Sequence, residues 1–103
     1  MSVMVEFSVV PIGQGVSLSP IIARVLKIVR ESGVSYKANP MGTVLEGSWN
    51  DVMSIVKKCH DEVMREAERA VTTIKIDDRK GADDRMDKKL ASVEHLMGNK
   101  LIR

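Results

Sequence analysis

The stretch VSYKANPMGTVLEG, residues 34–47, reads as two short strands joined by a tight turn, and this hairpin is the centre of the predicted fold. β-branched and apolar residues fill both halves, and Pro40 and Gly42 interrupt the pattern between them. We expect Gly42 to let the hairpin turn and to let another group approach its backbone closely. Glu46 places a carboxylate within the second strand of this hairpin.

A strand and a helix are predicted before the hairpin. Residues 2–13, SVMVEFSVVPIG, alternate with period two and end at Pro11 and Gly13. A glycine-containing loop follows, and we expect Ser19 to be the N-cap of a helix that ends near Gly33. The apolar positions at helical spacing are Ile21, Ile22, Val25, Leu26 and Val29.

A second helix and a fourth strand are predicted after the hairpin. Ser48 is the expected N-cap, with Asp51 three residues later as in a capping box. Residues 70–77, AVTTIKID, alternate as a strand, and a last helix follows the polar turn after it. The buried stripe of the second helix is expected to be Val52, Met53, Val56, His60, Val63 and Ala67, and that of the last helix Met86, Leu90, Val93 and Met97.

The resulting order, β-α-β-β-α-β with a C-terminal helix, predicts an α+β fold of the ferredoxin-like plait type. One antiparallel sheet of strand order 4-1-3-2 would carry two helices on one face. The length of 103 residues fits a single domain over residues 1–103.

Composition argues against several classes of function. The formal net charge is only +2 and aromatic residues make up 3%, which disfavours nucleic acid as a partner. The single cysteine allows no intrachain disulfide. We recognise no signal peptide or membrane-spanning run, and expect a soluble, cytoplasmic protein with no membrane partner.

The sheet face opposite the two helices is the most informative surface. It is either a solvated face with paired charges or the wall of a polar pocket that a second subunit encloses. Carboxylates around an enclosed site would suit a cationic or amine-bearing ligand. The side chains expected on this face are Glu6, Ser8, Val44, Glu46, Thr73, Lys75 and Asp77, with Lys37 and Asn39 from the second strand.

Two other features carry weaker signals. The loop GQGVSLS, residues 13–19, precedes a helix N-terminus, where free N–H groups favour anions, although an ordinary turn explains it as well. Cys59 and His60 are adjacent on one helix, so their side chains diverge by about 100°. A packed histidine is therefore a better interpretation than a catalytic pair.

Three segments together resemble a known family. VVPIGQGVSLSPIIARV, YKANPMGTVLEGSWNDVMSIVKKCH and IKIDDRKGADD look like the thiamine-binding YkoF-like family, long of unknown function. The resemblance covers nearly the whole chain and implies a ferredoxin-like fold. It also implies a homo-oligomer, often a tetramer, whose ligand pocket lies between subunits.

The resemblance further implies a non-catalytic protein that binds thiamine or its hydroxymethylpyrimidine part and needs no cofactor or metal. The helix N-terminus, and not the resemblance, predicts a loop site for anions at Gly15, Ser17 and Ser19. This sequence has Met41-Gly42 where some ligand-binding members of the family have a polar residue before the threonine. The ligand of this protein can therefore differ from theirs. By position, the implied ligand-binding residues are Ser8, Pro11, Gly13, Asn39, Met41, Thr43 and Glu46.

Other functions compete with this one. The same plait is an RNA-recognition fold, but RNA binding needs exposed aromatic side chains on the central strands. Phe7 is the one aromatic residue there, and strand alternation predicts that it points into the core. A glutamate pair could act in acid–base chemistry, yet we see no nucleophile dyad or phosphate loop. A structural or regulatory homo-oligomer without a thiamine ligand is the main alternative.

Overall fold

The computed structural model describes residues 2–15, 17–81, 83 and 85–103. Four strands form one antiparallel sheet in the order β2-β3-β1-β4, which confirms the predicted ferredoxin-like order. The elements are β1 (Val3–Ile12), α1 (Ser19–Glu31), β2 (Ser35–Asn39), β3 (Gly42–Gly47), α2 (Trp49–Met64), β4 (Arg69–Asp77) and α3 (Arg85–Met97).

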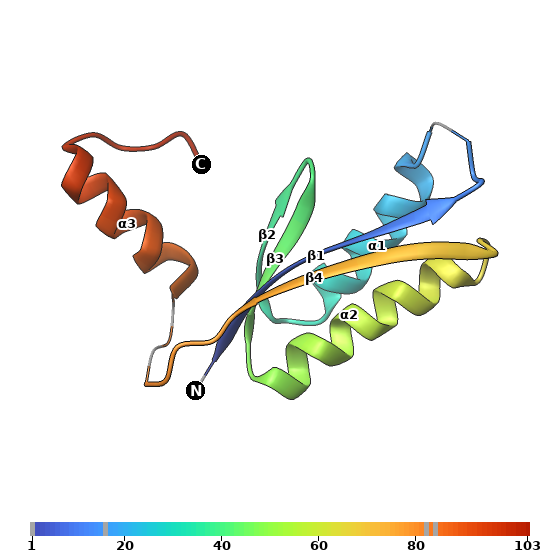
Figure 1. The fold of residues 1–103 in the computed structure, drawn as a ribbon, viewed down its shortest axis with the longest axis horizontal. Coiled ribbons are helices and arrows are strands. Elements are labelled where there is room, and N and C mark those ends of the chain that lie inside the picture. The colour runs from blue at the N-terminus through green and yellow to red at the C-terminus, as the bar shows by residue number, and fades with distance from the viewer. Residues whose placement is uncertain (1, 16, 82, 84) are drawn as a thin grey trace.

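The core lies between the sheet and the two helices α1 and α2, which cover the same face (Figure 1). Alternation along β1 sends Val5 and Phe7 into this core, and β3 adds Leu45. Val5 and Leu45 are completely buried, so the apolar phase of both central strands is as predicted. The opposite phase of each strand therefore points to the other face of the sheet, which we call the open face.

The helix α2 begins as predicted, but its buried stripe differs in part from the expectation. The Ser48 side chain accepts a hydrogen bond from the Asp51 backbone N–H at 3.2 Å, which confirms the N-cap. Cys59 is fully buried, whereas His60 is only partly buried. Cys59 packs as a small apolar side chain in place of the expected His60. Ile55 is also buried where Met53 was expected, whereas Val52, Val56 and Val63 are buried as predicted.

The start of α1 differs from the expectation. Leu18 is the N-cap, it makes no side-chain capping bond, and Ser19 is the first helical residue. Pro20 stands in the first turn, where its missing N–H costs no hydrogen bond. Gly33 follows the helix with φ +79°, so the predicted glycine stop is confirmed.

The hairpin between β2 and β3 turns at Pro40 and Met41, so the prediction that Gly42 makes the turn is wrong. Gly42 is the first residue of β3 and pairs with Asn39. A Cβ atom there would lie 3.2 Å from the carbonyl oxygen of Phe7, which is tighter than ordinary contact. The glycine is therefore needed for the close approach of β1. The prediction that another group lies close to the Gly42 backbone is confirmed.

The helix α3 stands apart from the two-layer body and meets it at the start of the helix (Figure 1). Met86 in its first turn is buried, whereas Leu96 near its end is 85% exposed. The tail after α3 folds back on the helix, where the Leu101 N–H donates to Glu94 at 2.7 Å. No helix within the described residues is long and apolar enough to cross a membrane.

Candidate functional site

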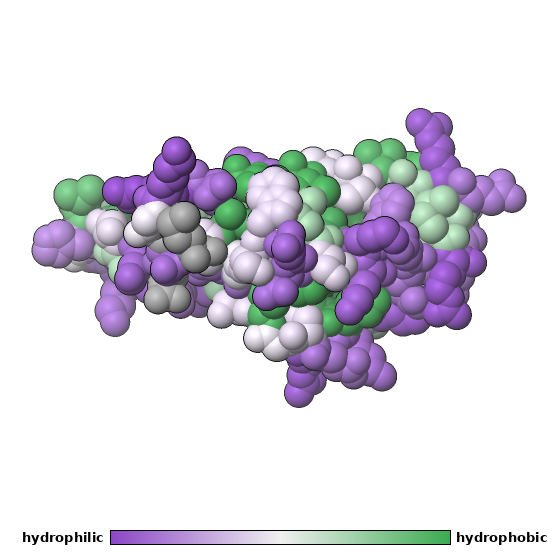
Figure 2. Space-filling model, turned by 90° about the horizontal axis from the view of Figure 1, so that it is seen from below, coloured by the Kyte–Doolittle hydropathy of each residue, from purple (hydrophilic) through white to green (hydrophobic). Residues whose placement is uncertain are grey.

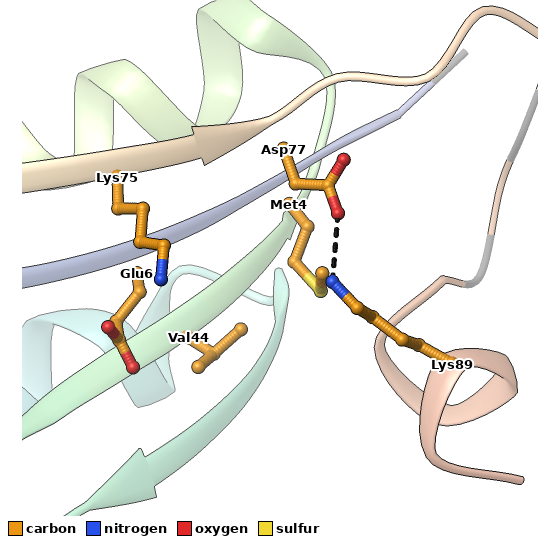
Figure 3. A pocket seen from close by; sticks show the side chains of 6 residues that line it. All are labelled: Met4, Glu6, Val44, Lys75, Asp77 and Lys89. Carbon is orange, nitrogen blue, oxygen red and sulfur yellow. Dashed lines mark hydrogen bonds and ion pairs between the residues drawn. The ribbon is translucent and has the colours of Figure 1, made fainter. Parts of the chain in front are cut away.

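A cavity of about 170 Å³ lies on the open face of the sheet, beside the start of α3 (Figure 3). It combines two carboxylates, two ammonium groups and two apolar side chains. Strands β1, β3 and β4 supply five of its lining residues, and α3 supplies one. The lining residues are Met4, Glu6, Val44, Lys75, Asp77 and Lys89.

Strand register places Glu6 at the centre of this cavity. Glu6 lies directly opposite Val44 on one neighbouring strand and Lys75 on the other. The Glu6 and Lys75 side chains extend over the same part of the sheet (Figure 3). Opposite charges at directly paired positions of a sheet attract one another, and the Glu6 carboxylate is exposed on the surface.

Glu46, the carboxylate inside the hairpin strand, holds α3 on the sheet. Its two carboxylate oxygens accept hydrogen bonds from the backbone N–H groups of Arg85 at 2.6 Å and Met86 at 3.2 Å. These N–H groups belong to the first turn of α3, where helices have no internal acceptors and favour negative charge. Glu46 is buried, with 9% of its surface exposed.

Two ion pairs also connect α3 to the sheet. Lys37 of β2 binds Asp87 at 2.6 Å, and Lys89 of α3 binds Asp77 of β4 at 3.2 Å (Figure 3). The hydrogen bond from Lys37 lowers the pKa of Asp87 from its usual 3.8, and the charges of Lys37 and Arg103 act in the same direction. The open face is thus bordered on one side by α3.

We expect acid to weaken the attachment of α3. Because the pKa of Asp87 is lower in the folded protein than the ordinary 3.8, its contribution is complete above about pH 4. The contribution is lost as pH falls through the folded-state pKa. NMR titration from pH 6 to pH 2 should show changes in the amides of α3 that are smaller in Lys37→Ala. Identical titrations of the two proteins would contradict this role for the ion pair.

The structure divides the predicted ligand-binding residues between separate places. Ser8, Asn39 and Glu46 lie on the open face, according to their pairing positions. Thr43 is buried on the helix side of the sheet, and Met41 is 90% exposed at the tip of the hairpin. The open face therefore brings three of the predicted residues to one surface.

Pro11 and Gly13 lie at the opposite end of β1 from Glu46. Glu46 pairs with Met4 at the start of β1, and Pro11 is buried near the end of that strand. The ten residues of β1 span roughly 30 Å, so one small ligand cannot contact both ends. Ligand binding at Pro11 and Gly13 would need a site distinct from the cavity.

The predicted anion loop precedes α1 at this far end. Gly15, Ser17 and Ser19 are exposed, and Gly15 adopts φ +81°. Val16, within the same loop, lies outside the described residues. Anion binding at this loop stays a prediction.

Sequence reasoning missed the contribution of α3 to the site. Lys89 of α3 lines the cavity, and Glu46 accepts a hydrogen bond from Arg85, which lies 39 residues later in the sequence. No periodic pattern in the sequence relates α3 to the sheet residues that it contacts. Met4 lies in the same phase as Glu6 and was predictable from alternation alone.

The remaining titratable candidates lie away from the open face. His60 Nδ1 is 2.6 Å from Thr72 Oγ1, in a shallow hollow between α2 and β4. Burial raises the pKa of the Cys59 thiol to about 11, which keeps it protonated and unreactive. Among the described residues, no group of His, Cys, Asp and Glu side chains is arranged to hold a metal ion.

Comparison with known proteins places this arrangement in a family. A UPF0045 protein of Mycobacterium bovis is 39% identical over 98 residues, covering 94% of this chain and 96% of its own. The structure of a Methanocaldococcus jannaschii protein has a TM-score of 0.83, at 30% identity, covering 89% of this chain and 95% of its own.

A structure from Thermotoga maritima, of a protein provisionally assigned to thiamine biosynthesis or salvage, has a TM-score of 0.79. It is 26% identical and the match covers 90% of this chain and 99% of that protein. The sequence profile described as thiamine-binding protein matches residues 5–94. The chain therefore belongs to the thiamine-binding protein family, and its UPF0045 relatives span nearly all of its length.

Proposed function

We propose that the protein binds thiamine or a related hydroxymethylpyrimidine, without catalysis, in the cavity on the open face. Membership of the thiamine-binding protein family is the observation that carries the proposal. The Thermotoga maritima neighbour, provisionally assigned to thiamine biosynthesis or salvage, supports the same ligand class.

The chemistry of the cavity suits an aminopyrimidine. The exocyclic amino group of such a ring is a hydrogen-bond donor, and the Glu6 carboxylate is an acceptor on the cavity floor. Met4 and Val44 supply apolar surface for the ring, and the Met4 sulfur is polarizable enough to lie against it. Glu6 is thus the residue we expect to orient the ligand.

Binding without chemical change is the simplest use of these groups. Asp77 is already paired with Lys89, and both oxygens of Glu46 are occupied by α3. Glu6 is left as a carboxylate beside Lys75. The two oxygens of this side chain can accept hydrogen bonds from the amino group of a ligand.

The size of the cavity supports a site completed by a second copy of the chain. Small-molecule sites usually enclose about 300–1,000 Å³, whereas this cavity measures about 170 Å³ and is open to one side. One ring fits such a space, and the rest of a thiamine-sized ligand would stay exposed. A second subunit over the open face would enclose it.

Titration calorimetry with thiamine and hydroxymethylpyrimidine tests the ligand. We expect a dissociation constant in the micromolar range, roughly −8 kcal/mol. Glu6→Gln should weaken binding by about 1.5–3 kcal/mol, because it removes a charged hydrogen-bond acceptor. Glu68→Gln, an exposed glutamate between α2 and β4, is the matched control and should bind like the wild type.

Two results of that titration would contradict the proposal in different ways. The absence of heat with either ligand would remove the ligand assignment. Equal binding by Glu6→Gln together with loss in Glu46→Gln would return the ligand contact to Glu46, the carboxylate predicted from the sequence.

A homo-oligomer, most simply a tetramer, is the second part of the proposal. Val93, Leu96 and Met97 expose 43%, 85% and 52% of their surfaces on α3, and exposed apolar surface on a projecting helix suits contact with another subunit. A structural or regulatory oligomer without a thiamine ligand is favoured by the same observation. Light scattering at micromolar concentration should give a multiple of 11.4 kDa. A monomer mass would contradict both versions.

A further inference from the structure

A second hollow lies next to the open-face cavity, between the turn that follows β4 and the helix α3. Its volume is about 580 Å³, and Lys89 lines both hollows. Hydrophilic side chains crowd this end of the molecule (Figure 2, left). Five cationic side chains line the hollow: Arg79, Lys80, Arg85, Lys88 and Lys89. We call this group the basic hollow.

Several carboxylates nearby are already bound to other groups. Asp83, which also lines the hollow, accepts a hydrogen bond from the Ser2 backbone N–H at 2.7 Å. That bond is the main reason why the pKa of Asp83 is lowered, so the group stays ionised and attached to the N-terminal segment. Asp77 and Asp87 are held in the ion pairs of Lys89 and Lys37.

Arg79 and Lys80, by contrast, make no ion pair within the described residues. Both are exposed on the turn, and both line the basic hollow. A guanidinium and an ammonium group beside one concave surface form a favourable environment for a phosphate, since arginine can bind two of its oxygens at once.

We infer that the basic hollow binds the phosphate group of a phosphate ester whose ring occupies the neighbouring cavity. This inference rests on the proposed function for the identity of the ring. The ligand class is then the phosphorylated aminopyrimidine or thiamine phosphate, in preference to the free alcohol. Lys89 stands at the boundary, so the ring and the phosphate of one molecule would contact the two hollows in succession.

The charge of the ligand gives the preference its physical basis. A phosphate monoester carries about −1.5 to −2 charges at pH 7, whereas the hydroxymethyl group carries none. The cations attract the ester and gain nothing from the alcohol. Because these side chains are exposed, the attraction should fall with added salt, as the screening length shrinks from about 10 Å at 0.1 M to about 3 Å at 1 M.

Calorimetry with hydroxymethylpyrimidine and its monophosphate tests the inference. We expect the wild type to bind the phosphate at least about tenfold more tightly, which corresponds to about 1.4 kcal/mol. Arg79→Ala/Lys80→Ala should lose this preference and keep its affinity for the alcohol. The matched control is Arg30→Ala/Lys58→Ala, which removes the same charge from α1 and α2 on the other face of the sheet and should keep the preference.

Equal affinity of the wild type for the two ligands would overturn the inference while leaving the proposed function intact. A preference that survives in Arg79→Ala/Lys80→Ala would overturn it as well. If neither pyrimidine binds, titration with inorganic pyrophosphate tests phosphate binding in the basic hollow separately from pyrimidine binding in the cavity. Pyrophosphate binding that is lost in the double variant would support the basic hollow by itself, and absence of pyrophosphate binding would then overturn it.

Discussion

Replacing Glu46 by alanine is expected to release α3 from the sheet and to lower the free energy of unfolding by about 3 kcal/mol. The variant removes both acceptors of the Arg85 and Met86 backbone N–H groups, at 2.6 and 3.2 Å. Hydrogen bonds to a charged group contribute more than neutral ones, and these lie at a partly buried helix start. Glu46→Gln keeps one acceptor oxygen and should lose about half as much.

Urea denaturation and amide hydrogen exchange measure the two consequences. Exchange at Arg85 and Met86 should accelerate in Glu46→Ala, while the amides of β1 keep their order of protection. Glu68→Ala removes an exposed glutamate and is the matched control, with a change within about 0.5 kcal/mol. Unchanged exchange at the start of α3 would contradict the role of Glu46.

Truncation of Leu45 is expected to have the other large effect. Leu45 is fully buried on the helix side of β3, in one cluster with Phe7 and Val52. Leu45→Ala should destabilise the fold by about 2–5 kcal/mol, because it removes apolar contacts and leaves a cavity. Its neighbour Glu46 points to the open face, so the same strand anchors the core and holds α3.

Leu96→Ala provides a control with the same chemical change. Leu96 is 85% exposed near the end of α3, so its truncation in the monomer should change stability by less than about 0.5 kcal/mol. Both variants can be compared by urea denaturation at low protein concentration. Similar losses in the two variants would contradict the position of the core between the sheet, α1 and α2.

Local sequence patterns were sufficient to predict most of the fold. Alternation in β1 and β3 predicted the faces of Val5, Phe7 and Glu46, because side chains in a strand point to opposite sides in turn. The failed prediction for the hairpin turn depends on a neighbour distant in sequence. Gly42 is required by the Phe7 carbonyl of β1, and no local turn pattern contains that contact.

The candidate site was predicted only in part, for the same physical reason. The open face and its carboxylates follow from strand phase, so Glu6, Lys75 and Asp77 were expected there. The position of α3 is determined by hydrogen bonds and ion pairs to β2, β3 and β4, and it converts Glu46 from an open carboxylate into a helix anchor. Helical periodicity predicts that a helix forms but not where it docks.

Backbone amide shifts measured on addition of hydroxymethylpyrimidine show where the ring binds. We expect the ring in the cavity lined by Met4, Glu6, Val44, Lys75 and Asp77. The largest shifts are predicted at these positions and at Lys89, with smaller ones along α1 and α2 on the other face. Shifts confined to the loop before α1, or no shifts at millimolar ligand, would contradict binding in this cavity.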